Sequence, residues 1–273
     1  MRTSLKSQRG FSLIEIMVVM LILTIVMGVL FAAINQVQKR YRTEEQRVDV
    51  MQNAREFVDQ IGRDLHNSGY PNNRMYAVDK ITSTSNSYWY AAKGLVAASS
   101  TEIILDGDME GLGTSAPGGT PVSVIRYKLE PNASGSCPCT LRRSAVGKPL
   151  GGTTNVEAMP YAFNAEVENV VNSTGGGASA WTIAGNAPGG ASNDTVYGNY
   201  KINPVFQFLD KNGGLVSGVP ATLAAGNMAA GKTAADSTAM IVVTLSVMGP
   251  TPDMDTKRRP VATMRTTLNL PNR

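Results

Sequence analysis

The apolar positions of the chain follow three successive patterns, of which the first is an almost unbroken apolar run from Phe11 to Ile34. These 24 residues are interrupted only by Ser12, Glu15, Thr24 and Gly28. A helix of this length covers about 36 Å, which exceeds the roughly 30 Å hydrocarbon core of a bilayer. The sequence therefore predicts a membrane-spanning helix over residues 11–34.

A cleaved secretory signal peptide is the alternative explanation of this run. Such a peptide has an apolar core of about 7–15 residues followed by a small-x-small cleavage site. The run here is longer, and it places Leu30 or Phe31 where the distal small residue belongs. We therefore expect the segment to be retained. Basic residues flank both ends, but those at 39–47 are mixed with acids and precede a long exported domain, so we place the N-terminus in the cytoplasm.

The second pattern is an amphipathic continuation over residues 35–69. Apolar residues recur three, four or seven positions apart up to Leu65, and charged residues occupy the other faces. Gly69 suits the left-handed position that follows a helix, and Pro71 prevents the helix from resuming. A helix from Ser12 to Asn67 is roughly 80 Å long. A compact domain cannot bury such a rod, so its apolar half requires lipid or other subunits.

The third pattern, over residues 70–273, consists of short β-like runs separated by Gly, Asn, Ser and Pro. It predicts an antiparallel β domain packed on the helix, and hence an α+β fold. Lys211–Gly214 predicts a hairpin turn, and the Gly/Ala-rich segments 172–193 and 218–235 predict surface loops. The predicted strands are 102–105, 122–129, 140–143, 200–209, 239–248 and 263–270.

Composition and charge remove several classes of function. The 273 residues are 42% hydrophobic and 17% charged, which is typical of a folded chain. The net charge is +4, but Arg2, Lys6 and Arg9 lie in the first ten residues, which leaves only +1 for the rest. Nucleic-acid binding usually requires a dense basic face. We therefore expect no nucleic-acid partner.

The two cysteines, Cys137 and Cys139, are separated only by Pro138. Together with the single His66 they cannot supply four zinc ligands. A disulfide between residues two apart is strained relative to the usual Cα separations, although an oxidising compartment permits it. We interpret the pair as two free thiols in a turn and keep the disulfide as the alternative.

Three further motifs resemble functional sites without the context that those sites need. Gly226–Thr233 matches the phosphate-binding loop pattern, but a poor strand precedes it and a poor helix follows. His66 is the sole histidine and lies in the last helical turn, where it offers no catalytic triad. Tyr88–Tyr90 is interpreted as packing between helix and sheet. We expect neither enzymatic activity nor a cofactor.

Asp106, Asp108 and Glu110 imitate the opening of a calcium loop, with oxygen ligands at alternate positions. The twelfth position of such a loop is Pro117 here, so the bidentate carboxylate is missing. We interpret the segment as an acidic turn, and keep these three residues as candidate calcium ligands that would need a distant carboxylate.

Glu15 is the unusual residue of the apolar run, because a carboxylate in a membrane span is unfavourable by up to about 3 kcal/mol and generally marks a function. As a structural alternative, Ser12 and Glu15 form a capping box pattern. The run from Arg9 to Glu15, RGFSLIE, followed by the apolar stretch, resembles the N-terminal signal of type IV pilins and type II secretion pseudopilins.

The resemblance implies a leader peptide, residues 1–10, which a prepilin peptidase removes between Gly10 and Phe11 on the cytoplasmic side. It implies N-methylation of Phe11 and, during filament assembly, pairing of Glu15 with the free amine of Phe11 of a neighbouring subunit. It also implies a pilin-like fold, in which one long helix packs on a β domain.

Weaker similarity extends over the remaining chain and points to large minor pilins of the PilW type, with the J-class pseudopilins as the alternative. The segments concerned are 59–71, 106–108, 124–127, 141–143, 206–210 and 266–272. The N-terminal motif does not distinguish a type IV pilin from a type II secretion pseudopilin. A membrane-tethered binding module or adhesin that never polymerises remains the alternative of another class, and Glu15 argues against it because a simple anchor does not need a carboxylate.

The function that the sequence predicts is therefore a structural one, in which a minor pilin helps to initiate or cap a pilus. Its expected partners are other pilin or pseudopilin subunits, the prepilin peptidase, the inner-membrane assembly platform and membrane lipid. Its expected location is the bacterial inner membrane, with one span and an exoplasmic C-terminal domain, and afterwards the filament.

Overall fold

A computed structural model describes residues 12–70, 92–108, 122–131, 137–148, 159–172, 197, 200, 202–253, 256 and 258–270. The chain divides into two compact units, Met1–Glu45 and Gln46–Arg273. Gly10, Phe11, Glu110 and Tyr88–Tyr90 lie outside the described residues, as does nearly all of the predicted loop at 172–193.

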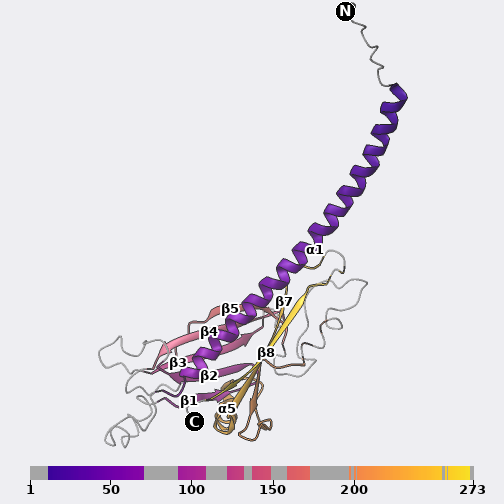
Figure 1. Ribbon diagram of the computed structural model, residues 1–273. Helices are drawn as coiled ribbons and strands as arrows, with labels where there is room; N and C mark the ends of the chain where they lie inside the picture. The colour runs from indigo at the N-terminus through magenta and orange to yellow at the C-terminus, as the bar shows by residue number, and fades with distance from the viewer. Residues whose placement is uncertain are drawn as a thin grey trace, which may run out of the picture. The chain divides into compact units, whose positions relative to one another are not determined.

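Helix α1, Leu13–Asn67, confirms the predicted long helix. Its end follows from the residues beyond it. The Ser68 hydroxyl donates to the carbonyl of Leu65 at 2.7 Å, and Gly69 has a φ of 78°, the left-handed conformation that glycine adopts without strain. Figure 1 shows α1 and the strands that its second half contacts.

The second unit contains an eight-stranded antiparallel sheet among its described residues. The strands are paired in the order β1-β2-β3-β4-β5-β7-β6, and β8 pairs with β7. Their bounds are β1 Gly94–Ala98, β2 Glu102–Gly107, β3 Ser123–Glu130, β4 Cys139–Gly147, β5 Asn164–Val170, β6 Phe206–Leu209, β7 Met240–Met248 and β8 Val261–Asn269.

Five of the six predicted strands correspond to β2, β3, β4, β7 and β8, with ends shifted by a few residues. The sixth, predicted for 200–209, was wrong in its first half, because only Phe206–Leu209 is a strand. Pro204 explains the late start, since it has no N–H for a ladder hydrogen bond. The predicted hairpin turn at Lys211–Gly214 is confirmed by the hydrogen bond from Val216 N–H to the Phe208 carbonyl, 2.9 Å.

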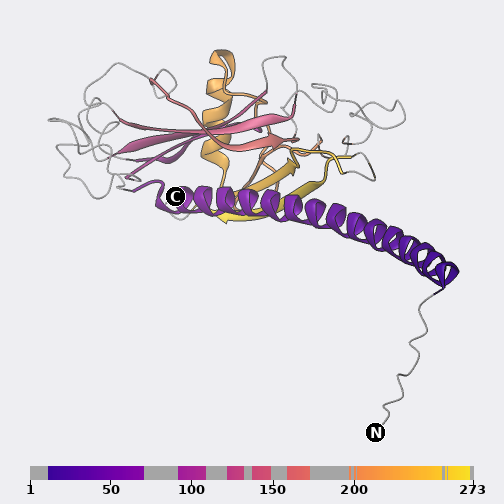
Figure 2. The same cartoon turned by 90° about the horizontal axis from the view of Figure 1, so that it is seen from above.

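Two helices pack against the sheet. One face packs against the second half of α1. Helix α5, Met228–Ser237, packs against the edge strand β1 and stands upright across the sheet in Figure 2. β1 and β2 are buried at every position, as expected of strands enclosed on both faces. The core residues from α1 are Val50, Ala54, Phe57, Ile61 and Leu65.

Helix α5 corrects the prediction that 218–235 is a surface loop. The second half of this segment is helical, and Met228, Ala234 and Ala235 are buried. Gly231 permits the close approach to β1, because a Cβ there would lie 3.2 Å from the carbonyl oxygen of Ala98 and would collide with the Leu223 side chain. Alanine is a good helix former, and packing on β1 stabilises a segment that composition alone marks as a loop.

Cys137 and Cys139 form a disulfide, where the sequence favoured two free thiols. Both residues are fully buried in the core, at the start of β4.

Candidate functional site

The first turn of α1 positions Glu15. The carbonyl of Ser12 accepts hydrogen bonds from the backbone N–H groups of Glu15, at 3.0 Å, and Ile16, at 3.2 Å. Glu15 is exposed, so its carboxylate is available to a group from outside this helix. The structure therefore presents an acid at the N-terminal end of the apolar helix, where the helix dipole also favours negative charge.

The apolar side chains that follow Glu15 are exposed on all sides of the helix. None of the most apolar 18-residue window is buried, and α1 is long and apolar enough to cross a membrane. Leu13, Leu21 and Phe31, for example, are more than half exposed. Burying each such side chain in apolar surroundings stabilises by roughly 1.5–3 kcal/mol, so lipid or other helices must cover this segment.

In the second unit, a buried ionic cluster holds α1 to the sheet. The Tyr127 hydroxyl of β3 donates to an Asp64 oxygen at 2.5 Å, and Arg143 Nε of β4 donates to the same oxygen at 3.0 Å. Gln60 donates to the other oxygen at 3.2 Å. Phe57 packs edge-on against the Tyr127 ring with centroids 5.6 Å apart. We call Asp64, Tyr127 and Arg143 the clamp.

The charges of the clamp are largely removed from water. The Asp64 and Arg143 side chains are 7% and 12% exposed. Burial raises the pKa of Tyr127 well above its usual range, and the neighbouring Asp64 carboxylate raises it further. Tyr127 therefore remains a protonated donor, and the clamp fixes residues 57–64 of α1 on the sheet. This gives the clamp a structural role.

A second buried ion pair anchors the end of α1. Asp106 accepts from the backbone N–H groups of Lys93 and Gly94, at 2.7 and 2.8 Å, and from Lys148 Nζ at 2.9 Å. Its backbone carbonyl accepts from Gly69 N–H at 2.9 Å. Both carboxylate oxygens of Asp106 thus accept hydrogen bonds from other groups of the protein.

Among the candidate calcium ligands, Asp106 has a buried carboxylate that is paired with the Lys148 ammonium group. Asp108 is exposed, and its backbone N–H donates to the carbonyl of Tyr70. Across the described ranges, no three His, Cys, Asp or Glu side chains are grouped so that they could hold a metal ion.

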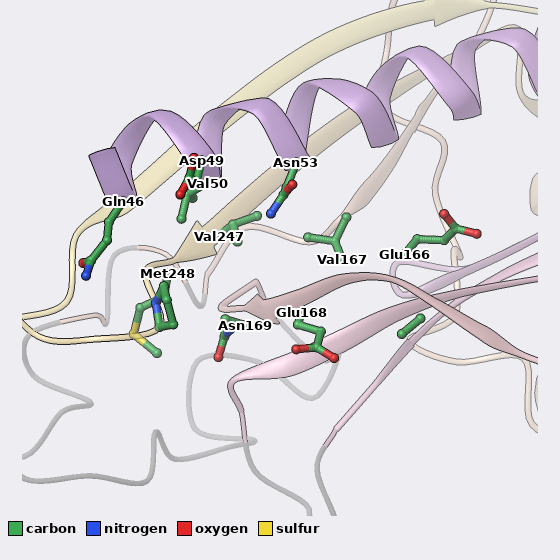
Figure 3. A pocket seen from close by; sticks show the side chains of 12 residues that line it. Gln46, Asp49, Val50, Asn53, Glu166, Val167, Glu168, Asn169, Val247 and Met248 are labelled. Carbon is green, nitrogen blue, oxygen red and sulfur yellow. The ribbon is translucent and has the colours of Figure 1, made fainter. Parts of the chain in front are cut away.

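A cavity of about 510 Å³ lies between α1, β5 and the end of β7. In Figure 3, Asn53 extends from α1 toward β5, which carries Glu166, Glu168 and Asn169, whereas Gln46 lies on the side of Met248 and donates to the Thr251 hydroxyl. The remaining lining residues are Asp49, Val50, Ala165, Val167, Val247, Met248 and Pro250.

Residues 5–31 match the family model described as the prokaryotic N-terminal methylation motif. The chain carries the prepilin-type motif. The matched residues contain Gly10, Phe11 and Glu15 together with most of the apolar run, and they support a type IV pilin or pseudopilin. The motif implies processing by a prepilin peptidase, assembly with other pilins and a structural role, and with the apolar helix it suits anchoring in the inner membrane. No curated protein and no solved structure matches the chain.

The remaining motifs have structural surroundings of their own. Gly231, Lys232 and Thr233 lie inside α5, where Thr233 donates to the Ala229 carbonyl at 3.1 Å. Backbone N–H groups within a helix are bonded to carbonyls and cannot cradle phosphates, so this is no phosphate-binding loop. His66 is exposed in the last turn of α1.

Sequence reasoning missed the clamp and the cavity. A signal for the clamp was present, because Asp64 lies in the apolar stripe of α1 between Ile61 and Leu65, and an acid at such a position needs a buried partner. The cavity had no comparable signal, because its lining comes from three segments far apart in the chain.

Proposed function

We propose that the chain is a minor type IV pilin that inserts in the inner membrane, loses its leader between Gly10 and Phe11, is methylated on Phe11, and helps to initiate or cap a pilus. The observation that carries this proposal is the methylation motif at 5–31, continuous with an exposed apolar helix that bears Glu15. The N-terminus lies in the cytoplasm before processing, and the second unit is exoplasmic.

The role of Glu15 follows from its surroundings. In an apolar medium an unpaired carboxylate is strongly unfavourable, and cleavage creates a free amine at Phe11. An ammonium group from a neighbouring subunit neutralises Glu15 while the two apolar helices cover each other. Assembly therefore satisfies the charge and the exposed apolar surface in one step.

The assignment to the minor class rests on the size of the mature chain. Removal of ten residues from the 273 leaves 263, which is large for a subunit present in bulk. The similarity of several segments to minor pilins of the PilW type supports the same assignment. A J-class pseudopilin of type II secretion has the same motif, and the machinery that copurifies with the chain separates the two.

The decisive experiment is mass spectrometry of the N-terminus of protein from native membranes. We expect the wild type to begin with N-methylated Phe11 and Gly10→Val to retain residues 1–10. Gly28→Ala is the matched control, because an added Cβ at Gly28 meets no atom within 4 Å, so this variant is expected to be processed normally.

Normal methylated Phe11 in the Gly10→Val variant would overturn the assignment. Filaments sheared from the cell surface are then analysed for the mature chain. Its presence there supports the pilus, whereas its presence only with secretion components favours the pseudopilin, and a chain that is processed but always monomeric favours the tethered binding module.

A further inference from the structure

Strand β8, the yellow arrow in Figure 1, is an edge of the sheet. It pairs with β7 without a bulge, from Val261 opposite Met248 to Asn269 opposite Met240. In the part of the chain that the structure describes, no strand pairs with its other side. From Thr263 onward, its side chains alternate between exposed and half-buried positions, and the half-buried apolar ones pack against the core. One long side of β8 is therefore open to other chains.

The backbone groups of β8 point alternately toward β7 and away from it. At one end the Leu270 N–H donates to the Ala239 carbonyl at 3.1 Å, and at the other the Gly249 N–H donates to the Pro260 carbonyl at 2.7 Å. Because the register between these two bonds is unbroken, the even-numbered residues of β8 face β7. The odd-numbered residues therefore direct their N–H and C=O groups outward. These residues are Val261, Thr263, Arg265, Thr267 and Asn269.

The other two edge strands are covered, whereas β8 is not. The outer side of β6 is closed by the chain that follows it, because the Val216 N–H donates to the Phe208 carbonyl. Helix α5 packs on β1, where Gly231 permits a close approach to Ala98. Among the described residues, no backbone hydrogen bond closes the outer side of β8.

The sequence of β8 also lacks the usual protection of an edge strand. Natural edges are kept apart by proline, lysine, bulges or short length. β8 has nine residues, VATMRTTLN, with no proline, no lysine and no bulge, and Arg265 is its only charged residue. Water satisfies the outward groups in the free chain. An edge of this length and composition is nevertheless a template for pairing with another strand.

Only an extended chain matches the outer side of β8. The outward N–H and C=O groups recur every second residue, about 6.8 Å apart, which is the repeat of a neighbouring strand. A single side chain or ion binds one such group and leaves the row unpaired. Arg265 favours an acidic residue directly opposite it, because opposite charges stabilise a cross-strand pair. Addition of a strand to an open edge is a recurrent mode of recognition between proteins.

The position of β8 beside α1 indicates where such a strand comes from. Leu268 of β8 packs next to Gly62 of α1, where an added Cβ would lie 3.8 Å from the Leu268 side chain. The exposed apolar half of the same helix needs other helices to cover it, so assembly brings further subunits to α1. A subunit that initiates or caps a filament is present in few copies. Its neighbour is therefore a different subunit.

We propose that β8 is the docking edge for an extended segment of a different subunit of the same filament. This segment adds a strand to the sheet and places an acidic residue opposite Arg265. The proposal rests on the proposed function, because the added strand belongs to a neighbouring pilin or pseudopilin. It gives the second unit a subunit contact of its own, in addition to the pairing of Glu15 in the apolar segment.

The test removes one outward backbone donor and leaves the pairing with β7 intact. Thr267→Pro replaces an outward N–H by the proline ring, which is tolerated on the open side of an edge strand. Thr267→Ala is the matched control, because it removes the same side chain and keeps the N–H. Each full-length variant replaces the wild type in filament-forming cells, and its amount in sheared filaments is measured by targeted mass spectrometry.

We expect Thr267→Pro to lower the recovery in filaments about fivefold or more and Thr267→Ala to lower it less than about twofold, since strand addition depends on backbone hydrogen bonds. The Tm of purified Thr267→Pro in mild detergent should fall by no more than about 4 °C, because no bond to β7 is lost. Arg265→Glu should lower the recovery about threefold or more, because like charges opposite each other destabilise a strand pair.

Hydrogen exchange of the wild-type chain gives a second readout that needs no variant. It is followed by mass spectrometry with fragmentation that resolves single residues. In the purified chain, the N–H groups of Met264 and Thr266, which face β7, should exchange slowly, and those of Arg265 and Thr267 should exchange rapidly. In filaments all four should exchange slowly.

The outcomes separate this inference from the proposed function. If both Thr267 variants are recovered alike in filaments, or if the outward N–H groups exchange as fast there as in the purified chain, the docking edge is overturned and the pilin assignment stands. Outward groups that are already protected in the purified monomer overturn it as well, because the chain then covers its own edge.

The identity of the neighbour is tested with two differently tagged copies of the full-length chain. Copurification of both tags from filaments in which the outward groups are protected would show that a second copy supplies the strand, and would overturn the assignment to a different subunit. If the chain is absent from sheared filaments and from every other assembly, both this inference and the proposed function fail.

Discussion

Replacing Arg143 by methionine tests whether the clamp holds the helix to the sheet through charge. Methionine keeps most of the aliphatic volume but removes the guanidinium, so the Asp64 carboxylate, 7% exposed, loses its cation. Breaking a buried pair in this way costs about 3–5 kcal/mol. Because Arg143 is 12% exposed and the Tyr127 hydroxyl still donates to Asp64, we expect the lower end, about 3 kcal/mol.

The neighbouring residue provides the control. Arg142 points to the opposite face of β4 and pairs with Glu130, and these side chains are 35% and 41% exposed. An exposed pair of this kind contributes about 0–1 kcal/mol, so Arg142→Met should change the stability little. Both substitutions remove one positive charge from the same strand, but the Arg143 pair is buried and the Arg142 pair is partly exposed.

The assay is thermal unfolding of the full-length protein in mild detergent, followed by near-UV circular dichroism, which reports tertiary packing of the β unit. For a unit of about this size, 1 kcal/mol shifts the Tm by about 2–4 °C, so Arg143→Met should lower it by about 6–12 °C. Adding Asp64→Asn should recover part of the loss, because the uncompensated charge is removed. Equal shifts for Arg142→Met and Arg143→Met would refute the reasoning.

Three further predictions concern other groups. The folded-state pKa of Tyr127 is raised, so its contribution to the stability of the folded state is complete below the usual tyrosine pKa of about 10 and is lost as the pH rises above that value. The Tm of Tyr127→Phe should therefore fall less steeply at alkaline pH than the Tm of the wild type. Lys148→Met leaves Asp106 buried without its cation and should destabilise the β unit by about 3 kcal/mol in urea unfolding. The backbone N–H of Gly69, which donates to the Asp106 carbonyl, should then exchange its hydrogen faster. Unchanged exchange at Gly69 would show that the ion pair does not hold the end of α1. Glu15→Val should preserve membrane insertion but reduce recovery in sheared filaments at least severalfold, and unaltered recovery would contradict the pairing of Glu15 with Phe11.

The parts of the fold that sequence predicts well are those whose pattern is local. The 3.6-residue recurrence of apolar positions runs through α1, and the Ser68–Gly69 exit marks its end, so both were predicted correctly. β3 and β7 likewise combine β-branched residues with turn residues at their ends. In each case the residues that determine the element are close neighbours in the chain.

The elements that were missed depend on distant partners. β5, with the sequence NAEVENV, has few strand formers and is held by its pairing with β4. β1 is a short apolar stretch without alternation, because both of its faces are buried. α5 contains Gly231 and many alanines, and becomes a helix where it packs on β1. Tertiary context overrides weak local preference in all three.

The candidate functional residues divide in the same way. The methylation motif, the apolar span and Glu15 are contiguous, and their chemistry depends only on charge and hydrophobicity in a fixed order, so the amino-acid sequence alone determines them. The Asp64–Tyr127–Arg143 clamp, the pairing of Asp106 with Lys148 and the acidic cavity join residues that are tens to more than a hundred positions apart. Only the tertiary structure decides which charges are buried together, because the free energy of a charge depends on the partners and the water around it, and neither is a property of its own segment of the chain.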